Sequence, residues 1–396
     1  LVWKQQPTTR TGPDELLPGL FYTLTGAFII AMYAVLVARS LGYMWIAMEA
    51  TTLMSAPLVY FHRSRDSLEA TWKYLLLCSV GIALALFGTV LIFSASQGLA
   101  PKGGTLLIPE LVARARELDP RLLRLGFVFC LVGYGTKAGL FPLHNWLPDA
   151  HSEAPAPSSA ILSGCLLNCA LVALWRITGI LNAAGQQRFT QHLLVPAAAL
   201  TVLAASLMLV RQHDLKRMWA YSSVEHVGLL ALAIGIGSGP VFLLHALNHS
   251  LVKAALFLLS GNVLALYGTK ALNDLGGLLR RAPGWGLLLG MGGFAVVGSP
   301  PFGVFLSEWW LLTRTLAVGE VWAAGVVLLG LTITFVAVSV HLAGVLFGGS
   351  ASEPHGGRLT ASSLVPGALL LGSLLAGLAL APPVMAALAR WSGVPR

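Results

Sequence analysis

Three ionisable side chains are spaced four residues apart within one apolar stretch of the chain. His245, His249 and Lys253 lie in FLLHALNHSLVKAALFLLSGNVLAL, which is otherwise apolar enough to cross a membrane. On an α-helix each four-residue step rotates the side chain by only roughly 40°, so all three share one face. Ionisable groups are costly inside a bilayer and commonly mark the path of a proton or an ion.

Further ionisable residues lie in other apolar stretches of the chain, namely Glu49, Lys137, His226 and Glu308. Titratable groups distributed over several membrane spans are typical of proteins that move protons or cations. The residue types therefore predict transport of a proton or a cation rather than a reaction on a bound substrate.

The composition places these groups in a membrane. The 396 residues are 56% hydrophobic and 10% charged, whereas soluble domains carry about 25% charged residues. Residues 74–93, YLLLCSVGIALALFGTVLIF, reach the ~20 residues needed to cross ~30 Å of hydrocarbon. The net charge of +9 comes from Lys and Arg scattered through short loops. Such residues set topology and contact lipid headgroups, and they lack the basic stripe that nucleic-acid binding requires.

The apolar segments predict an all-α polytopic membrane protein with about eleven transmembrane helices. Their approximate limits are 19–40, 43–61, 73–97, 123–143, 156–179, 190–210, 218–237, 240–266, 284–316, 322–348 and 362–388. We divide the chain into a polar segment at 1–18, five-helix repeats at 19–179 and 190–348, and an extra helix at 362–388. Because each repeat has an odd number of spans, the two copies would be inverted relative to one another.

Two spans contain sequences that must interrupt a helix. GYGTKAGLFP (133–142) holds Lys137 among glycines, and GSPPFG (298–303) precedes Glu308. Proline frees backbone carbonyls, so a break at membrane depth is tolerated where it lines a polar cavity. Transporters place ion sites at such breaks, so we expect an ion site at each.

The loops favour a cytoplasmic location for the amino-terminal side of the first span. Apart from the long loop at 98–122, twelve Lys and Arg residues fall on that side and six on the other, which is the direction of the positive-inside rule. We expect a multi-pass protein of the inner (plasma) membrane. The chain begins at Leu1 without a signal-peptide pattern, and it reads as part of a longer chain.

We expect no cofactor in this chain. Its cysteines lie within predicted spans and lack the spacing of an iron–sulfur ligand set: Cys78, Cys130, Cys165 and Cys169. Neither a dinucleotide fingerprint nor a P-loop occurs, so we expect no nucleotide. Any electrons would travel in partner subunits.

The turn HNWLPDAHSEAP holds several groups of the kinds that bind metals: His144, Asp149, His151 and Glu153. Their spacing fits no standard zinc pattern. We interpret the segment as an interfacial turn, with Trp146 at headgroup level. Lys73 is interpreted as an interfacial anchor.

Four stretches resemble one protein family in both order and spacing. They are GTKAGLFPLHNWLPDAHSEAPAPSSAILSG (135–164), HDLKRMWAYSSVEHVG (213–228), HALNHSLVKAALFLLSGNV (245–263) and GSPPFGVFLSE (298–308). They are similar to the antiporter-like, proton-pumping membrane subunits of respiratory complex I and group 4 hydrogenases. AMEATTL (47–53) and SLEATWKYLLLCSVG (67–81) look like the F-type subunit of hydrogenase-4 and formate hydrogenlyase complexes. The resemblance covers about residues 20–390.

The resemblance implies a fold of fourteen helices with two inverted five-helix repeats, of which this chain would supply the fourth to the fourteenth helix. It implies that Glu49 is the glutamate of the fifth helix, Lys137 the lysine of the broken seventh, and Glu308 the exit group of the broken twelfth. His245, His249 and Lys253 would form the central relay of the eleventh.

The chain departs from the family in the eighth helix. Many relatives carry Lys or His where this chain has Asn168, which hydrogen-bonds but does not titrate near neutral pH. The resemblance therefore implies either a relay bridged at Asn168 or a copy that pumps poorly.

Three function classes follow. The first is a proton-translocating subunit that couples electron transfer in partner subunits to proton pumping. The second is a cation/proton antiporter or an ion-coupled uptake subunit without redox partners. The third is a structural membrane subunit whose relay no longer conducts, which Asn168 favours slightly. The hydrogenase-type motifs favour the first, with other membrane subunits of a hydrogenase or complex I-like assembly as partners.

The residues also have structural alternatives. In the first, Lys137 caps the carbonyls of a broken helix. In the second, the histidines of the row are buried residues whose hydrogen bonds are satisfied within the protein, and Lys253 extends to the interface. Glu225 and His226 lie within about two turns of a basic loop and would be interfacial.

We expect particular contacts among the candidate residues. An unpaired buried charge is costly, so Glu49 and Lys137 should lie on facing helices and pair directly or through one water. We expect one polar line across the bilayer, which is formed by Lys137, the row of His245, His249 and Lys253, and Glu308. Asn168 should bridge Lys137 to the histidines on this line, and His226 is a further candidate bridge.

Overall fold

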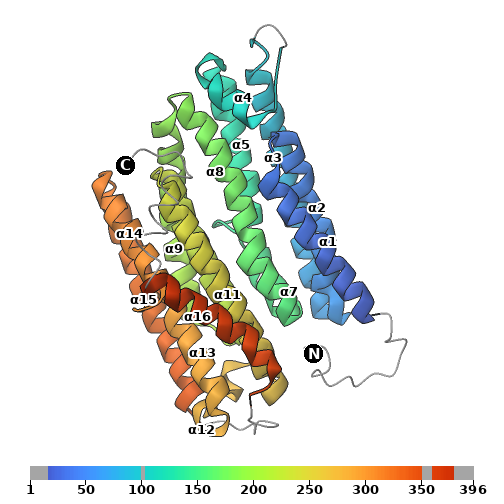
Figure 1. Cartoon of the computed structure of the whole chain (residues 1–396), viewed down its shortest axis with the longest axis vertical. Helices are drawn as coiled ribbons and strands as arrows, with labels where there is room; N and C mark the ends of the chain where they lie inside the picture. The colour runs from blue at the N-terminus through green and yellow to red at the C-terminus, as the bar shows by residue number, and fades with distance from the viewer. Residues whose placement is uncertain (1–16, 100–102, 350–358, 379–396) are drawn as a thin grey trace.

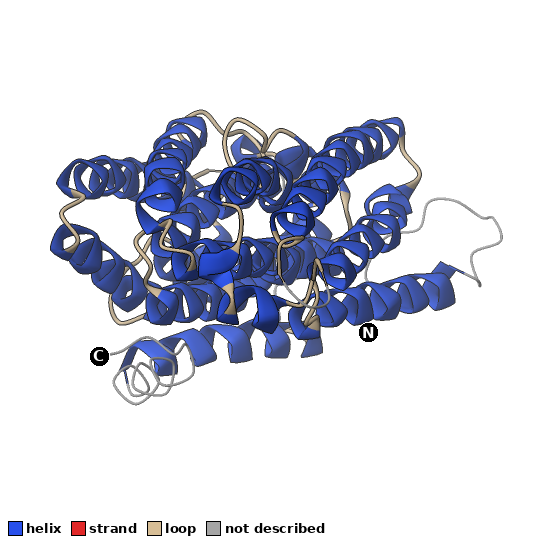
Figure 2. Ribbon diagram, turned by 90° about the horizontal axis from the view of Figure 1, so that it is seen from above, coloured by secondary structure: helices blue, strands red, loops and turns tan. Residues whose placement is uncertain are grey.

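The structure, a computed structural model, describes residues 17–99, 103–349 and 359–378. Within these ranges most of the chain forms α-helices that run side by side along the long axis of the molecule (Figure 1). Seen from above, they form an elongated bundle joined by loops (Figure 2). Seven of the described helices are long and apolar enough to cross a membrane. The predicted all-α polytopic class is confirmed.

The first half of the bundle contains long helices, two short ones and one that a π-helical turn interrupts. Its helices are α1 (Leu17–Val37), α2 (Leu41–Val59), α3 (Arg65–Ala95), α4 (Ile108–Ala113), α5 (Pro120–Ala138), α6 (Trp146–Glu153), α7 (Ala156–Ile161) and α8 (Leu167–Ala183). A π-helical turn, Leu162–Leu166, joins α7 to α8. Asp119 caps α5 by accepting from the backbone N–H groups of Arg121 and Leu122 at 2.8 and 3.1 Å, which fixes where this helix begins.

The second half contains the remaining helices. They are α9 (Gln187–Leu209), α10 (Leu215–Gly235), α11 (Gly239–Tyr267), α12 (Leu278–Arg281), α13 (Pro283–Val296), α14 (Gly303–Ala317), α15 (Val321–Phe347) and α16 (Leu364–Leu378). Asp214 caps α10 through the N–H groups of Lys216 and Arg217 at 2.8 and 2.9 Å. In Figure 1, α16 crosses obliquely over its neighbours, and it contacts α11, α13 and α14.

Both predicted breaks occur, although the first is displaced. Helix α5 continues through Lys137 and ends at Ala138, and α13 and α14 are separated by residues 297–302. The first break begins after Lys137 because the backbone N–H groups of Gly139 and Leu140 both donate to the Gly135 carbonyl at 2.9 Å. This capping arrangement, with φ 90° at Gly139, ends the helix with Lys137 in its last turn.

Each of the eleven predicted segments contains helix, the last only to residue 378, beyond which it lies outside the described residues. Most of the predicted polar segment 1–18 also lies outside them. The division into repeats at 19–179 and 190–348, and their inversion, stay predictions. Helices α7 and α8 lie between the earlier helices and α9–α15 (Figure 1), and they contact both groups.

Paired glycines let α3 and α5 approach closely. A Cβ atom on Gly133 would lie 2.5 Å from the Gly81 carbonyl oxygen, and one on Gly88 would lie 2.6 Å from the Gly126 carbonyl oxygen. Small residues at a helix interface allow this approach in membranes, where no hydrophobic force drives helices together. The close crossing brings the Lys137 end of α5 against α3.

We expect Gly133→Ala to destabilise the protein, because its methyl group would overlap backbone atoms of α3. Overpacking of this kind costs about 1–3 kcal/mol, which thermal unfolding of the purified protein in detergent would detect as a lower Tm. Gly26→Ala in α1 is the matched control, since nothing lies within 4 Å of its added Cβ. Equal Tm values for the two variants would contradict close packing at this crossing.

Candidate functional site

Lys137 is held by hydroxyl groups from two other helices. Its side chain is fully buried, and its Nζ donates to Thr52 Oγ1 on α2 and to Tyr74 OH on α3, both at 2.8 Å. Tyr74 OH in turn lies 2.6 Å from Ser55 Oγ, and Nζ lies 4.8 Å from the centre of the Tyr74 ring. Neutral oxygens and an aromatic face therefore surround this ammonium group.

Glu49 faces the same pair of helices but does not pair with Lys137. Its Oε1 accepts from Ser79 Oγ at 3.3 Å, and its Oε2 is buried without a hydrogen-bond partner. Among the described residues no ion pair joins Glu49 to Lys137, so the expected direct pairing is not formed. Thr52, which binds Lys137, lies three residues after Glu49 on α2, and this spacing places both on one face.

Lys253 lies at the centre of α11 and binds α10. It is fully buried, and its Nζ donates to Ser222 Oγ at 2.6 Å and to the Trp219 carbonyl at 3.3 Å. Like Lys137, it contacts neutral acceptors. Its buried position does not fit the alternative in which it snorkels to the interface.

The histidines form a chain of hydrogen bonds that ends at the second break. His226 Nε2 lies 3.1 Å from the Val296 carbonyl, and His226 Nδ1 lies 3.0 Å from His245 Nε2. His245 Nδ1 lies 2.8 Å from Ser307 Oγ on α14. The Val296 carbonyl accepts only, so a neutral His226 carries its proton on Nε2 and accepts from His245 on Nδ1. A neutral His245 then accepts from Ser307.

The Ser307 hydroxyl has two acceptors for one proton. Besides His245, it reaches the Val304 carbonyl at 2.8 Å. Rotation of this single hydroxyl therefore makes or breaks the link between the histidines and α14, whose next residue is the predicted exit group.

His249 connects the row to the π-helical turn. Its Nε2 donates to the Ser163 carbonyl at 3.1 Å, and Ser163 Oγ lies 2.8 Å from Ser223 Oγ on α10. The His249 and His226 rings lie 5.3 Å apart. Single π-turns within helices occur frequently at functional sites, and this one brings the α7–α8 segment to the histidines.

Asn168 lies beside α11 but has other partners than expected. Its Nδ2 donates to the carbonyls of Gly164 and Ala246 at 3.1 Å and to Ser250 Oγ at 2.9 Å. In the part of the chain that the structure describes, Asn168 has no hydrogen bond to Lys137 or to a histidine. Its Oδ1 is buried without a partner.

Glu308 packs against the second break. A Cβ atom on Gly298 would fall on the Glu308 carboxylate, and Gly298 has a φ of 66°. The side chain is buried, and its Oε1 has no hydrogen-bond partner. Gly298 therefore provides both the left-handed backbone and the space that this carboxylate occupies.

Glu225 and His226 are not interfacial. They lie in the middle of α10, and each is only 1% exposed. Both carboxylate oxygens of Glu225 lack a hydrogen-bond partner. The alternative that places them near the basic loop does not fit this burial.

The structure gathers the candidate residues into two clusters. The first holds Glu49 and Lys137, and the second holds the histidines, Lys253 and Glu308. Within the described residues no hydrogen bond connects the two clusters. The single line joined by water stays a prediction.

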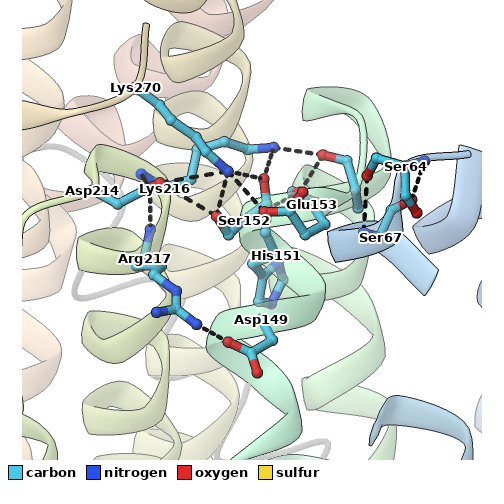
Figure 3. A network of polar contacts seen from close by, with 12 residues as sticks. Ser64, Ser67, Asp149, His151, Ser152, Glu153, Asp214, Lys216, Arg217 and Lys270 are labelled. Carbon is cyan, nitrogen blue, oxygen red and sulfur yellow. Dashed lines mark hydrogen bonds and ion pairs between the residues drawn. The ribbon is translucent and has the colours of Figure 1, made fainter. Parts of the chain in front are cut away.

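The turn 144–153 lies in a network of charged groups (Figure 3). Asp149 pairs with Arg217 and, at 3.0 Å, with Lys73. Lys270 lies 2.9 Å from Glu153 and 3.5 Å from Asp214. This network supports the interfacial position of the turn and of Lys73.

Trp146 is enclosed by protein and is not exposed to headgroups. It is fully buried, and its Nε1 donates to the Thr136 carbonyl at 2.8 Å. A carbonyl in the last turn of α5 has no partner within its own helix. The indole satisfies this carbonyl next to Lys137.

The sequence reasoning missed the hydroxyl residues that hold the ionisable groups. They are Thr52, Ser55, Tyr74, Ser163, Ser222 and Ser307. A signal was present for some of them, since Thr52, Ser222 and Ser307 lie within one helical turn of Glu49, Glu225 and Glu308 respectively.

Comparison with known proteins matches residues 38–334 to the family NADH:quinone oxidoreductase/Mrp antiporter, transmembrane. The chain is 41% identical over 342 residues to the hydrogenase-4 component F homolog of Methylacidiphilum infernorum, covering 85% of this chain and 70% of the relative. It is 32% identical over 379 residues to NADH-quinone oxidoreductase subunit N of Desulforudis audaxviator, covering 89% and 72%. Among solved structures, it superposes on a chain of the membrane-bound sulfane sulfur reductase, an archaeal respiratory membrane complex. The TM-score is 0.87 at 26% identity, over 99% of this chain and 78% of that one.

We expect Gly298→Ala to displace the Glu308 carboxylate and to lower stability, because the added methyl group would occupy its place at a positive φ. The left-handed conformation alone costs an alanine roughly 1 kcal/mol. Thermal unfolding of the purified protein measures the loss. Gly325→Ala in α15, where nothing lies within 4 Å, is the control, and equal Tm values would refute the packing of Glu308 on this glycine.

Tyr74→Phe is expected to destabilise the protein by about 1–3 kcal/mol, because it removes an acceptor from a buried ammonium group. Tyr43→Phe is the matched control, since Tyr43 is 72% exposed. The measurement is the difference in Tm between the two variants. A Tyr74→Phe protein as stable as Tyr43→Phe would mean that Lys137 does not depend on this hydroxyl.

Proposed function

Because this chain belongs to the NADH:quinone oxidoreductase/Mrp antiporter transmembrane family, we propose that it is the proton-translocating membrane subunit of a hydrogenase-4-type or complex I-like redox complex. Electron transfer takes place in partner subunits, and this chain carries protons across the membrane. The observation that carries the proposal is Lys253, a fully buried ammonium group that binds only neutral acceptors beside a hydrogen-bonded histidine chain.

The physical reason is the cost of a buried charge. An ammonium group among neutral oxygens is poorly compensated, so a small change in its surroundings decides whether it keeps its proton. Hydrogen bonds to charged groups contribute about 1.5–3 kcal/mol. Moving one charge against a membrane potential costs ~2.3 kcal/mol per 100 mV. The free energy of making or breaking one such hydrogen bond is therefore comparable to the work of moving one proton across the membrane.

The histidine chain provides a path for the proton toward α14. The separations along it, from 2.8 to 3.1 Å, lie within the reach of direct proton transfer. When a proton reaches His226, this ring donates from both nitrogens, so His245 must accept on Nε2 and carry its own proton on Nδ1, from which it passes to Ser307, next to Glu308. Ser307 controls this step, because its hydroxyl has the Val304 carbonyl as an alternative acceptor.

Lys137 and Glu49 act as a second loading site in the first half of the chain. Both contact the α2–α3 pair through hydroxyl groups. Movement of α2 relative to α3 would change the separation of the two charges, and with it the proton occupancy of Lys137. In this scheme Asn168 holds α8 against α11 through hydrogen bonds to the Ala246 carbonyl and to Ser250 Oγ.

We further propose that the chain is a multi-pass protein of the inner (plasma) membrane, with the amino-terminal side of α1 in the cytoplasm. The network of charged groups around the turn 144–153 includes three basic residues that support this orientation through the positive-inside rule. They are Lys216, Arg217 and Lys270. The partners are other membrane subunits of the complex. The similarity to a hydrogenase-4 component supports this assembly over an antiporter without redox partners.

Lys137→Ala and Lys253→Ala are expected to abolish proton movement while electron transfer in the partner subunits continues, or slows if coupling is tight. The measurement is proton uptake into vesicles that contain the intact complex, driven by its own electron donor. Arg121→Ala, at an exposed position in the first turn of α5, is the control. Wild-type uptake in both lysine variants would show that these residues are structural. Uptake that requires a sodium gradient instead of the electron donor would favour the antiporter.

A further inference from the structure

Glu225 is a buried carboxylate with one neutral donor beside it, the Thr334 hydroxyl of α15, which in the structure donates to Ser206 Oγ instead. Glu225 is 1% exposed, and neither Oε1 nor Oε2 has a partner. Buried polar groups are nearly always hydrogen-bonded, and an exception of this kind calls for an explanation. An ionised carboxylate is especially costly in such a place.

Glu225 lies one helical turn along α10 from a residue that binds the Lys253 ammonium group. Ser222, which accepts from Lys253 Nζ at 2.6 Å, precedes Glu225 by three residues. This spacing puts both side chains on one face, separated by roughly one 5.4 Å turn. Within the described residues Glu225 and Lys253 form no ion pair, so a proton passes between them when a side chain rotates or a water bridges them.

Helix α10 also packs against α14, the helix that carries Glu308. Glu308 Oε1 also has no hydrogen-bond partner. The two carboxylates thus come from different helices and share a region in which the described residues leave three of their oxygens unpaired.

The histidine chain does not include Glu225. Adjacent residues on a helix project about 100° apart, so Glu225 points away from the direction in which His226 meets His245. The region between Lys253 and Glu308 therefore contains two separate polar branches, one made of imidazoles and the other of a carboxylate.

We propose that Glu225 carries protons from Lys253 to Glu308, by rotation of its side chain or through water, as a branch that bypasses the histidine chain. The proposal rests on the proposed function and adds a relay residue to it. In the first step the N–H bond of the Lys253 ammonium group breaks and an O–H bond forms on Glu225. A neutral amine and a neutral carboxylic acid remain, so two buried charges disappear together.

In the second step the O–H bond of Glu225 breaks and the proton binds the Glu308 carboxylate. Two interacting carboxylates repel each other when both are ionised, so the proton is held by one or the other. This transfer leaves Glu225 ionised again, Glu308 then releases the proton on the exit side, and Lys253 regains a proton from the His249 side. Each cycle moves one proton from α11 to α14.

The test is Glu225→Gln in the intact complex, assayed by donor-driven proton uptake into vesicles. Gln keeps the shape of the side chain but cannot carry a proton. Because the histidine chain remains, we expect uptake to fall only to the rate that this chain alone supports, a partial loss smaller than the roughly 100-fold typical of a proton-transfer group without a parallel route. Glu225→Asp should recover part of it. The control is Glu110→Gln, an exposed glutamate of α4, which should match the wild type.

A spectroscopic readout separates a proton carrier from a structural residue. Infrared difference spectra, recorded as the complex turns over, should show a carboxylic-acid C=O band that shifts in deuterated water. The band should be absent in Glu225→Gln and displaced in Glu225→Asp. If Glu225→Gln does not assemble, the spectrum of Glu225→Asp is the test. A carboxylic-acid C=O band at the wild-type position in Glu225→Asp overturns the proposal.

The outcomes distinguish the two proposals. Wild-type uptake in Glu225→Gln together with lost uptake in Lys253→Ala overturns the Glu225 branch and leaves the proposed function standing. Wild-type uptake in Lys253→Ala overturns the proposed function itself. Lost uptake in Lys253→Ala and reduced uptake in Glu225→Gln, with partial recovery in Glu225→Asp, support the branch.

Discussion

Two buried ammonium groups constrain how the helices of this protein can be arranged. Lys137 and Lys253 are fully inaccessible, and hydrocarbon offers no water to solvate them. Each must therefore find oxygen atoms on neighbouring helices, which Thr52 and Tyr74 supply for Lys137 and α10 supplies for Lys253. Because these oxygens are neutral, they fix the positions of the charges without cancelling them. The same contacts hold the bundle together.

The helix breaks supply polar groups that a continuous helix would use itself. At the second break the Val296 carbonyl accepts from His226, and Gly298 leaves room for Glu308. At the first, the buried Trp146 satisfies the Thr136 carbonyl next to Lys137. Irregular backbone at membrane depth is stable only where such partners exist. Each break thus lies beside the ionisable group that it helps to position.

Close packing brings the polar groups together across long stretches of chain. The glycine pairs of α3 and α5 place Tyr74 within reach of Lys137, and the π-helical turn places Ser163 against His249. A larger residue or a regular α-helical turn would move these oxygens away from the nitrogens they bind. The apolar packing of the bundle and its proton chemistry therefore depend on the same few small residues.

The sequence by itself determined the all-α class, the eleven helical segments, both breaks and the row at His245, His249 and Lys253. These features follow from hydropathy, proline and four-residue spacing, which act within a few turns. Only the tertiary structure decided that Lys137 binds Tyr74 rather than Glu49, that Asn168 ties α8 to Ser250, and that Trp146 and Glu225 are buried. Such contacts depend on the rotation of one helix against another. That rotation is set by packing between residues as far apart as Ser163 and His249, 86 positions along the chain, which no local pattern encodes.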